Sequence, residues 1–348
     1  MAGSAAARLL DWDAAARLGS RLAGGPSVPR RAALHGELAR IVANAEDLVT
    51  GFTGLAIDGP PTRPWAMSRG QWVHRNVAGF ERVLAPWTER LLGRRGGGPL
   101  SAVRRKLLAA QVGGLLGYLG RKVLGQYDLF GQPGQDDDVL YFVLPNVVEL
   151  ERRYSFPPSD FRLWLALHEV THRVQFGGVP WLRGYVQGLV DRYLGSVDLD
   201  PRKLIETLKR AVEEARRNPQ WRGLGILFLL MTPEQREVFR RMQAVMSVLE
   251  GHANFVMDGL ARDNVRQGER MRRVLRRRRR GRPVDRFVQK TMGMEAKVRQ
   301  YDIGERFVAG AVDLLGMQGF SRVWEGPERL PTLEEIAAPA SWARRVAG

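Results

Sequence analysis

The sequence predicts a mainly α-helical protein with a small β element. In three early stretches, apolar residues recur every three or four positions, which is the period of a helix with one buried face. These stretches are 10–23, 30–50 and 69–92. One segment, VLYFVLPNV at 139–147, is instead rich in β-branched and aromatic residues and predicts a strand. Hydrophobic residues make up 44% of the 348 residues, which is enough for a substantial core.

Segments rich in Gly, Pro or Asp separate the predicted helices. They lie at 24–29, 58–64, 93–99 and 131–138. A long helix is expected after Ser101, where Gly113 and Gly117 stand one turn apart and would admit a neighbouring helix. The later helices are expected at 161–178, 181–194, 201–217, 233–262, 284–292 and 295–316.

The best domain boundary lies near residue 125. It separates an N-terminal helical region, 1–125, from a second region, 126–348, which contains the strand and the motif described below. The two regions could equally form one compact body.

The composition limits the class of protein. The chain has no cysteine, which excludes disulfides and thiolate metal sites. Its longest apolar runs, such as 225–231, are far shorter than the ~20 residues that span a bilayer, and the amphipathic start does not resemble a secretory signal. We therefore expect a soluble, cytoplasmic protein. The net charge of +17 would attract nucleic acid, anionic lipid or acidic proteins.

The segment 166–176 carries two of the five histidines in the chain. His168 and His172 stand four residues apart, so on a helix both imidazoles project from nearly the same face and can share one Zn²⁺. Glu169 lies on the flank of that face, placed to take a proton from an attacking water. This is the H-E-x-x-H pattern of zinc metallopeptidases. The alternative is a pair of packed core histidines, but the predicted buried helix around them favours zinc.

A catalytic zinc needs a third protein ligand. The metzincin pattern would place Gly at 175 and His at 178, but the chain has Gln175 and Gly178, which excludes that class. The candidates lie in the predicted buried helix at 246–258, which Glu250 and His252 interrupt. A buried carboxylate is costly unless it is paired or metal-bound, so we favour Glu250 and keep His252 as the alternative ligand.

Two further features surround Glu250. Gly251 and Ala253 are small and would leave room for the helix that carries the histidines. Asn254 follows Glu250 by one turn, which resembles the E-x-x-x-D arrangement of Glu-type zincins, in which the aspartate orients a histidine ligand. We expect Asn254 to accept a hydrogen bond in the same way through its carbonyl oxygen.

Five blocks, in order, resemble the actinobacterial zincin-like metallopeptidase type 2 family. They are LGQYDLF, YFVLPN, DFRLWLALHEVTHRVQF, MSVLEGHANFVMD and KVRQYDIGERFV. The resemblance implies a mostly helical, zincin-like fold around the H-E-x-x-H helix, and it names no substrate. The family pattern has Asp where this chain has Asn254. Members are often associated with the biosynthesis of a deazaflavin coenzyme, but these residues suggest no deazaflavin chemistry.

We therefore predict a zinc-dependent metallopeptidase. His168, His172 and Glu250 would bind Zn²⁺, and Glu169 would act as general base. Tyr301 lies in a block that the resemblance identifies and is the candidate for stabilising the oxyanion, with packing as its alternative role. The strand at 139–147 could pair with an extended peptide substrate, or could be purely structural.

The arginine run at 270–283 raises alternatives to the metallopeptidase function. Seven arginines fall within 272–280, and such blocks usually form solvated loops. Nucleic-acid binding is the sharper alternative, but no recognised fold motif or aromatic pattern accompanies the run. Two alternative functions remain: a zincin-fold scaffold or binding protein with little turnover, and a basic nucleic-acid-binding protein. An intact Glu169 favours the enzyme.

Overall fold

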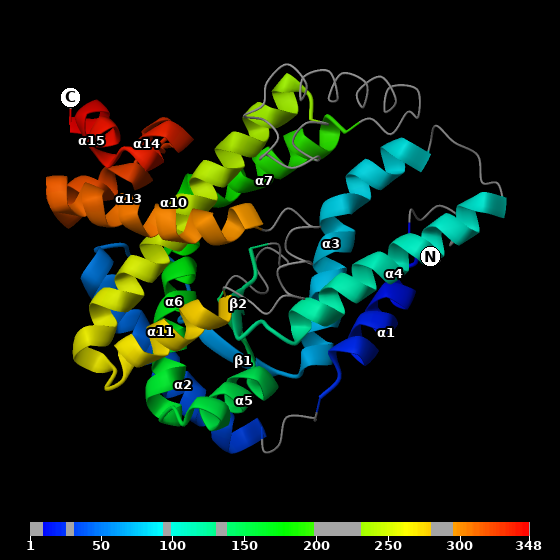
Figure 1. The fold of residues 1–348 in the computed structure, drawn as a ribbon, viewed down its shortest axis with the longest axis horizontal. Helices are drawn as coiled ribbons and strands as arrows, with labels where there is room; N and C mark the ends of the chain where they lie inside the picture. The colour runs from blue at the N-terminus through cyan, green and yellow to red at the C-terminus, as the bar shows by residue number, and fades with distance from the viewer. Residues whose placement is uncertain are drawn as a thin grey trace. The chain divides into compact units, whose positions relative to one another are not determined.

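The structure is a computed structural model that describes residues 10–25, 31–92, 99–129, 138–197, 231–279 and 295–347. The described residues are mostly helical, with one small three-stranded sheet, which confirms the predicted fold class (Figure 1). The chain divides into two units, one of residues 1–177 with 260–268 and one of residues 178–259 with 269–348. The predicted domain boundary near residue 125 stays a prediction.

The helices of the first unit follow the predicted apolar periodicity. They are α1 (Trp12–Ala23), α2 (Arg31–Thr53), α3 (Arg69–Leu92), α4 (Pro99–Gly120), α5 (Leu144–Tyr154) and α6 (Pro158–Gly178). Helix α1 begins where Asp11 accepts a hydrogen bond from the backbone N–H of Ala14, and it ends at Gly24, which has a positive φ of 54°.

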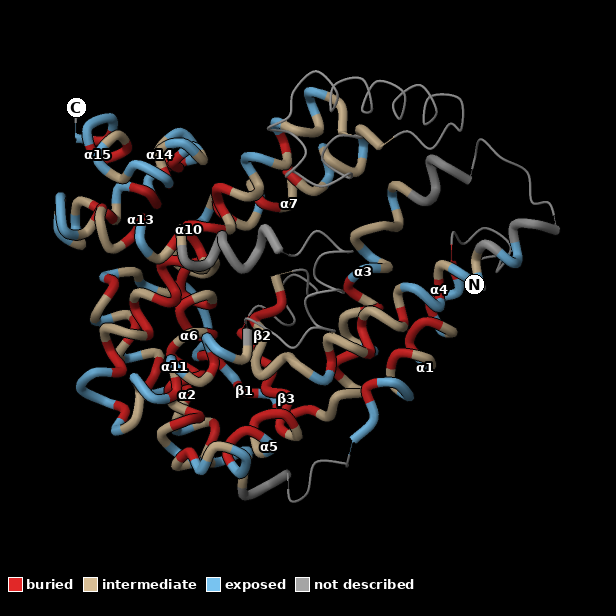
Figure 2. The backbone as a smooth tube through the Cα atoms, in the orientation of Figure 1, coloured by how far each residue is buried: buried red, intermediate tan, exposed pale blue. Residues whose placement is uncertain are grey.

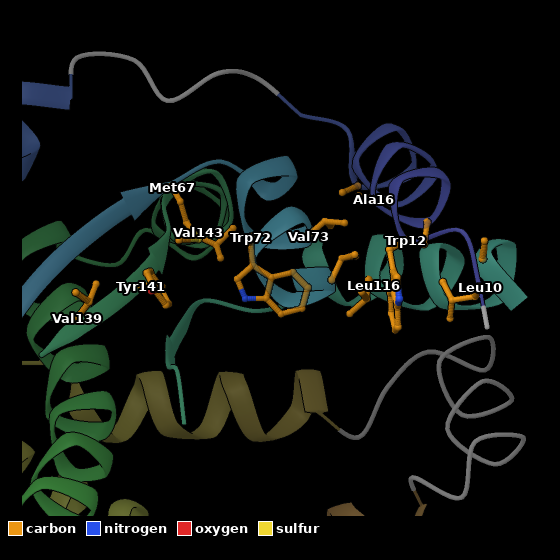
Figure 3. Packing of buried hydrophobic residues seen from close by; sticks show 14 residues of the cluster. Leu10, Trp12, Ala16, Met67, Trp72, Val73, Leu116, Val139, Tyr141 and Val143 are labelled. Carbon is orange, nitrogen blue, oxygen red and sulfur yellow. The ribbon is translucent and has the colours of Figure 1, made fainter. Parts of the chain in front are cut away.

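Helices α1 and α4 run side by side at close range (Figure 1). A Cβ atom added at Gly113 would lie 2.6 Å from the carbonyl oxygen of Ala15, and one added at Gly117 would lie 2.8 Å from that of Gly19. The expectation that Gly113 and Gly117 admit a neighbouring helix is therefore confirmed. Figure 3 shows how a hydrophobic cluster extends from this helix pair, through Trp72 of α3, to the sheet.

The sheet has the strand order β1-β3-β2, with β1 (Arg63–Met67) parallel to β3 (Val139–Val143) and β2 (Gly125–Tyr127) antiparallel to it. All five residues of β3 are buried, and Figure 2 shows this core continuing into α5. The strand predicted at 139–147 is confirmed as far as Val143. There α5 begins, with Pro145 in its first turn, a position that suits proline.

The position of β3 contradicts one expectation. Because β3 is the central strand, β1 and β2 occupy its two edges. Of the two roles left open for the segment at 139–147, the structural one is therefore confirmed, and pairing with an extended peptide is wrong for this strand. Among the three described strands, β1 and β2 are the ones with an edge where such pairing would be possible, and β2 is the one that lies beside Glu169.

A buried ion-pair group holds the first half of α6. Arg162 donates two hydrogen bonds, of 2.8 and 3.0 Å, to the carboxylate of Glu151 in α5 and a third, of 2.9 Å, to Glu37 in α2. Burial alone would lower the pKa of Arg162, but the hydrogen bonds and charge of Glu151, with those of Glu37, raise it above its ordinary value. Helix α6 is thus fixed to α2 and α5 upstream of the two histidines.

The second unit is also helical. Its elements include α7 (Pro180–Gly195), α10 (Pro233–Asn264) as far as residue 259, α11 (Gly268–Arg279) from residue 269, α13 (Glu295–Phe320), α14 (Leu333–Ala337) and α15 (Pro339–Ala347), with short 3₁₀ turns at Ser321–Trp324 and Pro327–Arg329. The helices predicted at 181–194, 233–262 and 295–316 are confirmed, the last continuing through a kink at Gly316. Those predicted at 201–217 and 284–292 lie outside the described residues.

The arginine run is helical as far as Arg279. Met271 and Leu275, one turn apart, are buried on one face of α11. Arg272 pairs with Asp258 and Glu305, and Arg276 also pairs with Glu305. The expectation of a solvated loop is wrong for this part of the run, because apolar residues at helical spacing lie among the arginines.

No described helix is long and apolar enough to cross a membrane.

Candidate metal centre

Helix α6 carries the two histidines as predicted. It begins at Pro158, slightly before the expected Phe161, because proline suits the first turn of a helix. Val170 and Val174 are fully buried, while His168 and His172 are half-buried. The two imidazole centroids lie 4.8 Å apart with the ring planes at 89°. The spacing in the sequence thus places both rings together on one face.

Glu250 lies on α10 and is also half-buried. Ligand-capable atoms of His168, His172 and Glu250 all lie within 4.8 Å of one another. Two imidazoles and one carboxylate form one of the donor sets that proteins use for catalytic zinc, which leaves a fourth position for water or substrate. The donor chemistry of these three residues therefore fits a zinc ion.

His252 lies elsewhere, in an aromatic cluster of the second unit. It is 1% exposed and stacks on Phe320, with ring centroids 5.4 Å apart and planes at 22°. Its edge also meets Trp324 at 5.2 Å between centroids. The structure thus gathers Glu250, rather than the alternative ligand His252, with the motif histidines, and it assigns His252 a packing role.

Gln175 is a part of the site that the sequence analysis did not identify. Its side chain is fully buried, and its Oε1 lies 2.9 Å from Nδ1 of His172. An amide oxygen only accepts hydrogen bonds, so Nδ1 carries the proton and Nε2 keeps the lone pair that a metal needs. Gln175 follows His172 by three residues and so lies on the same face of α6, which is the signal that could have revealed it.

Asn254 was predicted to orient a histidine. It is buried on α10, one turn after Glu250. Its orienting role stays a prediction, whereas Gln175 does contact a ring nitrogen of His172.

Glu169 lies beside strand β2. It is 7% exposed, and a Cβ atom added at Gly125 would lie 2.7 Å from its Cγ atom. Two residues along the strand, Tyr127 stacks on Phe176 of α6, with ring centroids 5.7 Å apart and planes at 18°. Strand β2 therefore lies along the flank of α6 that carries the predicted general base.

Helix α13 crosses α10 immediately after Glu250. A Cβ atom at Gly251 would overlap the backbone of Gly304, and one at Gly304 would overlap the carbonyl oxygen of Ser247. The expectation that Gly251 makes room for the motif helix is therefore corrected, since Gly251 makes room for α13. Tyr301 lies on α13 one turn before Gly304, but its side chain is outside the described part, so its role stays a prediction.

Comparisons with known proteins found one family and one solved structure that resemble the chain. The sequence pattern of the family described as "Zincin-like metallopeptidase" matches residues 10–343. The chain is also similar to the crystal structure of a "putative hydrolase with a novel fold" from Chloroflexus aurantiacus. The two are 32% identical and superpose with a TM-score of 0.73, over 97% of this chain and 99% of the other. No curated protein matches the chain. Taken with its His-His-Glu cluster, the match over nearly the whole length shows that this chain belongs to the zincin-like metallopeptidase family.

Proposed function

We propose that this protein is a zinc-dependent metallopeptidase. The observation that carries the proposal is the gathering of His168, His172 and Glu250, with Glu169 next to the first histidine on α6. Membership of the zincin-like metallopeptidase family and the likeness to a protein described as a hydrolase support metal-dependent hydrolysis in general. The choice of peptides as substrates and the roles of individual residues are our inference.

His168, His172 and Glu250 would hold the metal, with His172 oriented by Gln175. A bound Zn²⁺ would supply Lewis acidity, which polarises a carbonyl group and makes water a stronger acid near pH 7. Glu169 takes a proton from the attacking water as the water oxygen joins the carbonyl carbon. Glu169 then returns that proton to the nitrogen as the carbon–nitrogen bond breaks, so the amine leaves neutral.

Strand β2 is where we expect the substrate to bind. It lies at an edge of the described sheet and beside Glu169. An extended peptide that adds to this edge by backbone hydrogen bonds would bring its carbonyl groups close to the base. Tyr301 remains our candidate for stabilising the oxyanion, because α13 crosses α10 next to Glu250 and Tyr301 is one turn from that crossing.

The alternative of nucleic-acid binding through the arginine run has less support. Arg272 and Arg276 already pair with acidic side chains of α10 and α13, which reduces the positive charge that α11 offers to phosphates. Among the described side chains of α11, Arg270, Arg273 and Arg277 are exposed as well, but a few arginines on one helix make few phosphate contacts.

Peptide cleavage by a Glu169→Gln variant tests the proposal. We expect the zinc-loaded protein to cleave a fluorescence-quenched peptide library, and Glu169→Gln to lower kcat/KM by about 100-fold or more while retaining zinc. Glu269→Gln, an exposed glutamate of α11, is the matched control and should cleave normally. A zinc-loaded protein that cleaves no peptide would refute the peptidase and favour the scaffold.

A further inference from the structure

Gly125 begins strand β2 where the strand meets α6. It pairs with Phe142 of β3, and the adjacent Val143 N–H donates a 2.9 Å hydrogen bond to the carbonyl oxygen of Leu124. Gly125 does not adopt a positive φ. Its backbone conformation is therefore open to any residue, and a reason for glycine here must come from its surroundings.

The three atoms nearest to a Cβ atom added at Gly125 all belong to one side chain. A Cβ atom at Gly125 would lie 2.7 Å from Cγ, 2.9 Å from Oε1 and 3.0 Å from Cδ of Glu169. Ordinary carbon–carbon contact requires about 3.5 Å or more, so no side chain fits at Gly125 unless Glu169 moves. The backbone of β2 thus forms one wall of the space that Glu169 occupies.

The strand cannot retreat to make room. Side chains alternate along a strand, so Tyr127 shares the face of Gly125 and stacks on Phe176 of α6. Gln126 points the opposite way, where its Oε1 accepts a 2.6 Å hydrogen bond from Nε1 of Trp72. Strand β2 is held on one face by α6 and on the other by α3. A substitution at Gly125 would therefore displace the side chain of Glu169 rather than the strand.

We propose that Gly125 is a positioning residue for Glu169. By packing its bare backbone against the glutamate, it confines the carboxylate to the orientation in which it can exchange a proton with the attacking water. A larger residue would turn the carboxylate away while leaving the metal ligands in place. This inference rests on the proposed function, because it assigns Glu169 the role of base.

The test combines kinetics with stability. In zinc-loaded Gly125→Ala we expect kcat on the peptide library to fall at least about tenfold, with KM changed less than about threefold and zinc fully retained, since the loss of a general base costs about 100-fold or more. Gly114→Ala is the matched control, because a Cβ atom there meets nothing within 4 Å, and it should keep full activity.

The second readout does not depend on activity. Gly125→Ala should lower the thermal midpoint of unfolding by several degrees in the wild-type background and have no further effect in a Glu169→Ala background, where the overlapping atoms are gone. If Gly125→Ala lowered the thermal midpoint equally in both backgrounds, or left kcat unchanged in the zinc-loaded protein, the inference would be overturned. Failure of the wild type to bind zinc or cleave peptides would instead refute the proposed function, and the stability comparison would still test the contact.

Discussion

Replacing Gln175 by leucine should weaken metal binding without unfolding the protein. The substitution removes the amide oxygen that lies 2.9 Å from Nδ1 of His172 and keeps a side chain of similar size in a fully buried position. Without this acceptor, nothing in the side chain at 175 selects the tautomer with the proton on Nδ1. His172 then spends part of its time with the proton on Nε2, the atom that must be free to bind metal.

The size of the effect follows from the geometry. Hydrogen-bond partners of metal-bound histidines typically contribute about 10–100-fold in metal affinity, or about 1.4–2.8 kcal/mol. His172 is half-buried, so water can partly replace the lost acceptor. We therefore expect the lower end, a zinc dissociation constant raised about tenfold. Gln175→Glu keeps an acceptor at the same place and should retain affinity close to that of the wild type.

Competition with a chromophoric chelator measures the zinc affinity, and ¹⁵N NMR of the metal-free protein reports the tautomer of His172. Zinc affinity within about twofold of wild type in Gln175→Leu, together with an unchanged tautomer, would refute the role of Gln175. Loss of affinity in Gln175→Glu as well as in Gln175→Leu would show that packing, rather than the hydrogen bond, matters at this position.

Two further predictions concern the scaffold. Arg162→Met leaves the carboxylate of Glu151 buried without its partner and should lower the free energy of unfolding, measured in urea, by about 3–5 kcal/mol. The control Arg241→Met breaks an exposed pair and should lower it by less than about 1 kcal/mol. Equal losses in the two variants would contradict a structural role for the buried pair. The hydrogen bond from Arg63 lowers the pKa of Asp138 below its ordinary value, so this group stabilises the fold above that value and the stabilisation is lost as pH falls through the lowered pKa. We therefore expect the free energy of unfolding to fall less below about pH 4 in Asp138→Asn than in the wild type, when both are measured from pH 5 downward. Parallel curves of this free energy against pH would contradict the assignment.

The sequence predicted the elements whose signals are local. Apolar periodicity located α1, α3, α7 and α10 closely, because each buries one face against neighbours. Strands β1 and β2 escaped prediction for a different reason. They are five and three residues long, and they exist because β3 supplies their hydrogen-bond partners from outside the local sequence. The helix at the arginine run was not predicted, because arginines surround its buried apolar pair, Met271 and Leu275.

In the candidate site, too, the features with a local sequence signal were predicted and those that depend on distant residues were not. The histidine spacing is a property of one helix, so it could be read directly, and Glu250 stood out as a carboxylate in an apolar helix. The packing role of His252 could not be read, because Phe320 and Trp324 lie some seventy residues away in the chain. The contact of Gly125 with Glu169 depends on how β2 meets α6, which no local pattern encodes.

Zinc content of the purified protein, measured by mass spectrometry after zinc reconstitution, tests the central claim most directly. We predict about one zinc per chain, lost in both His168→Ala and Glu250→Ala and retained in His74→Ala, which removes an exposed histidine of α3. No zinc in the wild-type protein, or full zinc retention in Glu250→Ala, would contradict the assignment of His168, His172 and Glu250 as the metal centre.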